Sequence, residues 1–268
     1  MFLESMIKIL PNTKFSYSYS RGAIADRVKR SDEFNKQIFD RILQLYDKKT
    51  LCGIGVIKNS YNKFLPENKN IQISPLQARD YDEYGGGTRV EDINGHLIGY
   101  SIEIPVNVKK KLNILELPEF MHESTHVLDY LFNPKYISNY KKMCEKRIFD
   151  KDYFKIYDKW FYNTEDMLKN NKNKMLQKAE IETKKALEDV PFDEKIVFLN
   201  FIKYSMEMEK HAYEQEVMFR NLLLELKRNV DEESVVDYSK VNCFKEKIDI
   251  VNNLIKDEIE NKRIELLF

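Results

Sequence analysis

Glycine is absent from most of the chain: all eight glycines of the 268 residues lie between Gly22 and Gly99. Glycine supplies the positive-φ positions of tight turns and is unfavourable inside helices. Its distribution argues against a turn-rich second part. We therefore expect a mixed, turn-rich first part followed by a helical second part.

Cysteine and long apolar runs are also scarce. The three cysteines, Cys52, Cys144 and Cys243, are odd in number and widely spaced, which argues against a disulfide framework and favours a reducing compartment. No apolar run reaches the roughly 18 residues of a membrane span, and the charged, short N-terminal segment does not have the pattern of a signal peptide. We expect a soluble protein with no membrane partner, either cytoplasmic or exported without a cleavable signal, as secreted effectors are.

The sequence has no excess of charge of one sign, since 44 Lys and Arg residues balance 44 Asp and Glu residues. Surfaces that bind nucleic acids or anionic membranes depend on a basic excess. We therefore expect no nucleic-acid partner. A hydrophobic content of 43% in a chain of this length is enough for a substantial core and excludes the disordered class.

Two of the four histidines form a recognisable cluster, in which His122, Glu123 and His126 spell H-E-x-x-H. On an α-helix, positions i and i+4 project from one face, so both imidazoles can reach a single ion. The local sequence favours a helix from Glu116 to Asn133, because Pro118 suits a first helical turn and the proline after Asn133 ends the helix. The alternative is an ordinary helix that carries two surface histidines.

A catalytic zinc ion takes about four ligands and keeps one position for water, so this motif requires a third protein ligand. Glu123 is expected to act as general base and acid, taking a proton from zinc-bound water and passing it to the leaving amine. Asp129 lies about 10 Å along the helix from His122, too far to share the ion. It could instead orient His126 or be a plain polar position.

Upstream of the motif, the sequence predicts one helix and a small group of strands. Ser31 and Asp32 form a plausible N-cap for an amphipathic helix that ends near Lys48. Strands are expected at residues 51–58 and 70–74, followed by a glycine-rich turn or flap at residues 84–88.

The clearest hairpin pattern spans residues 88–104, where Asn94 and Gly95 fit a type I′ turn between two alternating segments. Because the second arm ends at Pro105, we expect it to be an edge strand. Such an edge could bind an extended peptide beside the metal, or could simply be blunted against aggregation.

Beyond Pro134 almost every segment has helical periodicity. Helices are expected at residues 135–150, 152–162, 164–190, 193–227 and 241–262. The last of these carries an apolar seam that packs on its own protein or, less simply, on a second copy. We expect one domain over residues 1–268, with a helical insertion at 134–192 and a C-terminal helix at 240–263.

The third ligand is sought on the long helix. Glu209, Tyr213 and Glu216 fall on one stripe, and Ala212 is small enough to allow close approach of another helix. Glu209 is the preferred candidate, and the alternative is a solvated acidic position. The rival carboxylates are Glu207, Glu214 and Glu216.

H-E-x-x-H followed downstream by a helical E-x-x-A, here Glu209 with Ala212, resembles the gluzincin-type zinc metallopeptidases. The resemblance implies an α+β, zincin-like fold: a small mixed sheet, an H-E-x-x-H helix, a downstream ligand helix and a helix-rich C-terminal half. It also implies one Zn²⁺ per chain, bound by His122, His126 and Glu209. The implied activity is that of an endopeptidase acting on a protein or peptide substrate.

The sequence departs from that family at one position and leaves others open. Many gluzincins carry an Asp four residues after the ligand Glu to orient a histidine, whereas Tyr213 stands there in this chain. Tyr130, Tyr204, Tyr213 and His96 are candidates for stabilising the oxyanion, with none preferred. A second hypothesis is a non-catalytic helical module that binds partner proteins through residues 135–190 or the C-terminal seam.

Overall fold

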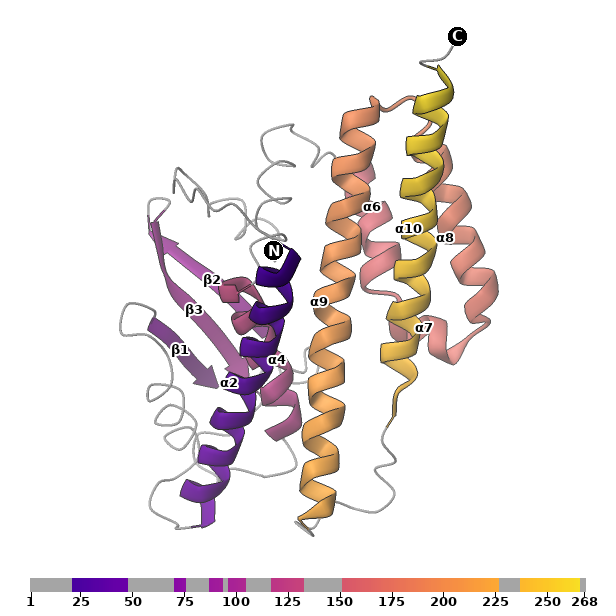
Figure 1. Ribbon diagram of the computed structural model, residues 1–268. Coiled ribbons are helices and arrows are strands. Elements are labelled where there is room, and N and C mark those ends of the chain that lie inside the picture. The colour runs from indigo at the N-terminus through magenta and orange to yellow at the C-terminus, as the bar shows by residue number, and fades with distance from the viewer. Residues whose placement is uncertain are drawn as a thin grey trace. The chain divides into compact units, whose positions relative to one another are not determined.

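The computed structural model describes the backbone of residues 21–47, 70–75, 87–93, 96–104, 117–132, 151–226 and 237–265, and the side chains of 32–45, 117–129, 153–226 and 237–264. Those residues form seven helices and three strands (Figure 1). The chain divides into two compact units, residues 1–133 with 215–236 and residues 134–214 with 237–268. The segments predicted as a strand at 51–58 and as a helix at 135–150 lie outside the described residues. The single domain expected from the sequence stays a prediction.

In the first unit, helix α2 (Arg21–Asp47) packs against α4 (Leu117–Phe132). Apolar residues of α2 recur at helical spacing, and Phe39 stacks on Phe219 of helix α9 (Phe192–Glu225) with ring centroids 4.5 Å apart. The predicted N-cap at Ser31 and Asp32 is wrong, because the helix already begins at Arg21. Asp32 is tolerated inside the helix because its carboxylate accepts a hydrogen bond from Gln215 Nε2 at 3.0 Å.

Strands β1 (Asn70–Pro75), β2 (Gly87–Ile93) and β3 (His96–Ile104) form a mixed sheet in the order β1-β3-β2 (Figure 1). The predicted hairpin is confirmed, since β2 and β3 pair antiparallel with Ile93 opposite His96. The predicted strand at 70–74 is confirmed as well.

The edge-strand prediction for the second arm of the hairpin is wrong. Strand β3 is central, because β1 pairs with it in parallel on the side that β2 leaves open. The backbone amides and carbonyls of β3 are therefore paired on both sides of the strand. They are not available to bind a peptide by strand addition. Pro105 lies just beyond the last residue of β3, where a proline is tolerated without an edge.

The predicted fold class requires correction. All described buried side chains belong to helices or helix ends, so the described core of each unit is helical, and the described residues include seven helices. The α+β, zincin-like class is therefore wrong for this chain, although the H-E-x-x-H helix and the downstream helix are both present. The strands predicted within the described residues are confirmed, and the error lies in inferring the class from them, because fold class depends on which faces bury one another and the described buried faces are helical.

The second unit contains α6 (Lys151–Phe161), α7 (Thr164–Lys169), α8 (Lys172–Ala186), α10 (Ser239–Glu265) and the first part of α9. The single helix predicted at 164–190 is wrong, because the chain breaks at Asn170 and Asn171. The Asn171 side chain caps α8 by accepting a hydrogen bond from the Lys174 amide at 3.1 Å.

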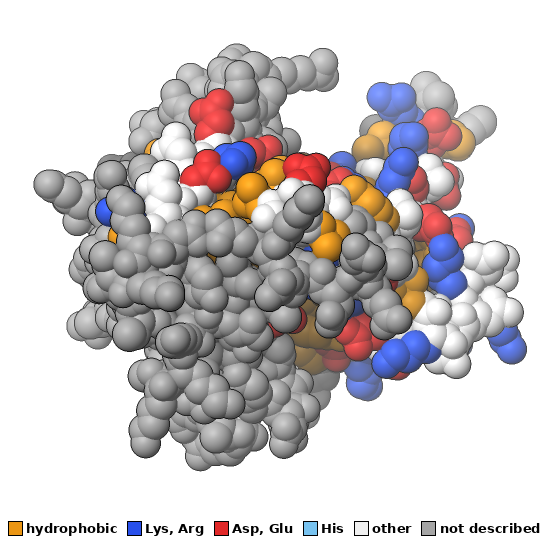
Figure 2. Space-filling model, turned by 90° about the horizontal axis from the view of Figure 1, so that it is seen from below, with side chains coloured by type: hydrophobic (Ala, Val, Ile, Leu, Met, Phe, Trp, Pro, Cys, Tyr) orange, Lys and Arg blue, Asp and Glu red, His pale blue; other side chains and the backbone are white. Residues whose placement is uncertain are grey.

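The C-terminal helix is confirmed and packs against α7 and α8 of the same unit. Val241, Phe244, Ile248 and Val251 of its predicted seam are buried, whereas Ile259 is 37% exposed. Among the helices that the structure describes, none combines the length and apolar character required to cross a membrane. In Figure 2, acidic and basic side chains are interspersed on the described surface, consistent with the balanced composition.

Candidate metal centre

Helix α4 brings the two histidines of the motif together. The Nε2 atoms of His122 and His126 are 3.3 Å apart, and both residues are buried, with exposed fractions of 8% and 9%. Two nitrogens that each lie about 2.0–2.1 Å from a tetrahedral zinc ion are about 3.3–3.4 Å apart. The separation of the imidazole nitrogens therefore fits bidentate binding of one ion.

Glu209 of α9 completes a group of three ligand-type side chains. The ligand atoms of His122, His126 and Glu209 all lie within 4.8 Å of one another, and the group could hold a metal ion. Two imidazoles and a carboxylate are a donor set that zinc accepts, as other first-row metals do. Glu209 is the carboxylate that we preferred as third ligand from the sequence. The role of Glu209 as a ligand remains a prediction.

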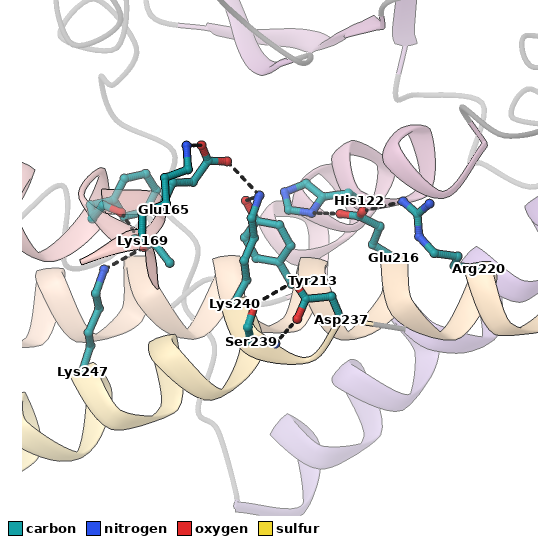
Figure 3. A network of polar contacts seen from close by, with 12 residues as sticks. His122, Glu165, Lys169, Tyr213, Glu216, Arg220, Asp237, Ser239, Lys240 and Lys247 are labelled. Atoms are coloured by element: carbon teal, nitrogen blue, oxygen red, sulfur yellow. Dashed lines mark hydrogen bonds and ion pairs between the residues drawn. The ribbon is translucent and has the colours of Figure 1, made fainter. Parts of the chain in front are cut away.

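A second carboxylate of α9 contacts the other ring nitrogen of His122. Glu216 Oε2 lies 3.3 Å from His122 Nδ1, and Arg220 Nη2 donates a hydrogen bond to Glu216 Oε1 at 3.1 Å (Figure 3). Burial raises the pKa of the Glu216 carboxyl, but the contacts with His122 and Arg220 outweigh burial and hold its pKa below the usual value. Glu216 is therefore ionised at neutral pH.

An ionised Glu216 favours one tautomer of His122. A carboxylate beside Nδ1 favours the proton on that nitrogen, which leaves the Nε2 lone pair directed toward His126. This is the protonation state that a metal-binding imidazole requires. The sequence identified Glu216 only as a rival ligand, although its position seven residues after Glu209 puts both acids on one face of α9.

The other rival carboxylates form ion pairs within α9. Glu207 lies 3.7 Å from Lys203, and Glu214 lies 2.6 Å from Lys210. Both contacts join residues four apart on the helix surface. Neither belongs to the group of ligand atoms that Glu209 forms with the two histidines, so both are weaker candidates than Glu209.

The roles predicted for Glu123, as general base and acid, and for Asp129, as a group that orients His126, remain predictions. Glu123 directly follows His122 on α4 and is half-buried, so its carboxylate retains access to solvent. Asp129 is buried, with an exposed fraction of 5%, one helical turn after His126. A buried carboxylate at that position suits the orientation of a histidine better than a solvated surface role.

The candidates for the oxyanion group have different surroundings. The Tyr213 hydroxyl lies 3.5 Å from Lys240 Nζ in the second unit, and Lys240 also pairs with Glu165 at 3.0 Å (Figure 3). Burial, with a smaller contribution from Glu207, raises the pKa of Tyr204, so its hydroxyl stays protonated at neutral pH. The side chains of Tyr130 and His96 lie outside the described residues.

Comparison of the chain with protein-family models, with curated proteins and with solved structures found no significant match.

Proposed function

We propose that this chain is a zinc-dependent peptidase that hydrolyses a peptide bond with metal-activated water. The observation that carries the proposal is the 3.3 Å separation of the His122 and His126 Nε2 atoms, with Glu209 in the same group. Glu123 follows His122 directly, where the carboxylate of a hydrolytic H-E-x-x-H motif stands.

Each residue of the site has a separate role in the proposed reaction. His122 and His126 supply neutral Nε2 ligands, Glu209 supplies the anionic ligand, and Glu216 holds the proton of His122 on Nδ1. A bound zinc ion supplies Lewis acidity, which lowers the pKa of water to about 7. The Glu123 carboxylate takes the proton that is released and gives it to the nitrogen of the departing amine.

Metal analysis and peptide cleavage by the parent chain and by Glu123→Gln test the proposal. Glu119→Gln is the matched control, because Glu119 lies on the same helix but is exposed. We expect one zinc per chain in all three proteins and cleavage of a mixed peptide library by the parent and the control. Loss of a general base should slow cleavage by Glu123→Gln by about 10²–10⁴-fold. Zinc well below one ion per chain, or equal cleavage by Glu123→Gln, would contradict the proposal.

The same experiment distinguishes a non-catalytic interaction protein. That alternative is favoured by exposed apolar side chains of the second unit, including Ile181 on α8 at 65% and Tyr162 in the turn after α6 at 52% exposed. Cleavage that a chelator abolishes and added zinc restores would exclude it.

A further inference from the structure

The two residues enclosed by the histidine motif are held by a buried side chain of another helix. Asn35 of α2 is fully buried; its Nδ2 donates to Thr125 Oγ1 at 2.7 Å, and its Oδ1 accepts from Ser124 Oγ at 2.6 Å. Thr125 Oγ1 donates in turn to the Met121 carbonyl at 2.8 Å. One amide therefore holds two consecutive residues of α4 by hydrogen bonds to both.

This contact lies on the side of α4 away from the imidazoles. At 100° per residue, Ser124 points about 180° and Thr125 about 80° around the helix axis from the mean direction of His122 and His126. Two short bonds to adjacent residues resist rotation of the helix about its axis, because any rotation lengthens at least one of them. Rotation is the motion that would turn both Nε2 atoms away from a common point.

The alternative role for such a network is packing alone. Buried polar groups require partners wherever they occur, and a satisfied network stabilises the fold without any connection to a ligand. The two roles differ in one consequence: a packing network affects metal affinity only as far as it affects folding, whereas a network that positions the ligands affects metal affinity directly.

We propose that Asn35 is a positioning residue for the metal centre: through Ser124 and Thr125 it fixes the rotation of α4, so that the His122 and His126 Nε2 atoms face one point. The inference depends on the proposed metal-dependent function. It adds a residue of α2, 87 positions before His122, to the determinants of metal affinity.

The test compares Asn35→Ala and Thr125→Val with Thr183→Val in the full-length chain. Thr183 is a matched control in the second unit: it is buried, accepts a hydrogen bond from Trp160 Nε1 at 2.9 Å and donates to the Ala179 carbonyl at 2.7 Å. Thr125 has the same two kinds of bond. Each valine therefore removes an equivalent pair of buried hydrogen bonds from a helix.

Zinc affinity is measured by competition with a chromophoric chelator, the geometry of the site by the visible spectrum of the Co²⁺-loaded protein, and stability by urea unfolding of the metal-free protein. We expect Asn35→Ala and Thr125→Val to weaken zinc binding about 10–100-fold, as loss of groups that orient ligands does. Their Co²⁺ spectra should change, whereas Thr183→Val should lose stability and keep the parent affinity and spectrum.

Parent-like zinc affinity in both Asn35→Ala and Thr125→Val would overturn the inference, as would an equal loss of affinity in Thr183→Val. If Asn35→Ala does not fold, Thr125→Val decides, because it nearly preserves side-chain volume. A parent chain that binds no zinc would instead contradict the proposed function, and that result is obtained before any variant is made.

Discussion

The two compact units use their buried polar groups differently. In the second unit, the fully buried Lys247 donates to the Trp160 carbonyl at 2.8 Å and to Thr164 Oγ1 at 2.7 Å, so that α10 is joined to α6 and α7. In the first unit, Asn35 likewise joins two helices, but on another face of the same helix α4 the Nε2 atoms of the two histidines lie 3.3 Å apart.

This difference separates scaffold from site. Polar groups in a scaffold are arranged so that donors meet acceptors of the same protein. At the motif of the first unit, two like nitrogens lie 3.3 Å apart with a carboxylate behind one of them. At that distance the two rings can share a hydrogen bond, and with Glu209 they form a group that could hold a metal ion, so these buried polar groups are the candidates for a functional site.

Removing one imidazole should have the largest effect. We expect His122→Ala to abolish stoichiometric zinc binding, because a site with three protein ligands loses one ligand and the Glu216 contact together. His211→Ala is the control, since His211 lies on α9 and is not a member of the ligand group. Metal analysis after dialysis is the measurement, and retention of one zinc by His122→Ala would contradict the assignment.

Glu216→Gln should have the next largest effect, because it keeps the shape of the side chain and removes its charge beside His122 Nδ1. Partners of metal-binding histidines contribute about 10–100-fold to metal affinity. Glu207→Gln serves as control, because Glu207 pairs with Lys203 and not with a histidine. Chelator competition measures the zinc affinity of both variants. Equal affinities of Glu216→Gln and Glu207→Gln would show that Glu216 does not orient His122.

Lys247→Met tests how the buried polar group of the second unit changes the pH dependence of stability. Burial lowers the pKa of Lys247 from 10.5 to about 8, so between these values the unfolded chain binds more protons than the folded chain. Stability attributable to this group therefore rises with pH, by about 2 kcal/mol between about pH 7.5 and pH 10.

Between these two pH values, the free energy of unfolding in urea should rise by about 2 kcal/mol more for the parent than for Lys247→Met. Lys245→Met, at an exposed position of the same helix, should show no such difference. A parallel pH dependence in the parent and Lys247→Met would contradict the predicted titration.

Exposed ion pairs should have the smallest effect, and the effect should be similar in the two units. Lys36 pairs with Asp40 at 2.7 Å in the first unit, and Lys184 pairs with Glu180 at 2.8 Å in the second. Both contacts are solvent-exposed pairs four residues apart, so Lys36→Ala and Lys184→Ala should each cost less than about 0.5 kcal/mol. A larger loss in urea unfolding in only one unit would show that the units also differ at their surfaces.

Local sequence patterns predicted most helices and strands, but not which of them contact one another in space. The helix from Leu117 to Phe132 and the hairpin pairing of Ile93 with His96 follow from short-range periodicity and turn chemistry. The central position of β3 does not, because β1 reaches it from a distant part of the chain. The beginning of α2 at Arg21 does not follow from local patterns either, since Asp32 lies inside the helix and contacts Gln215 instead of capping the helix.

The sequence by itself determined that His122 and His126 share a face, because 3.6 residues per turn fixes the direction of side chains four apart. Only the tertiary structure decided that Glu209 joins that group, that Glu216 contacts Nδ1 of His122, and that Asn35 holds Ser124 and Thr125. The physical reason is that each of these contacts joins helices far apart in the chain, and no local propensity specifies which buried faces will meet.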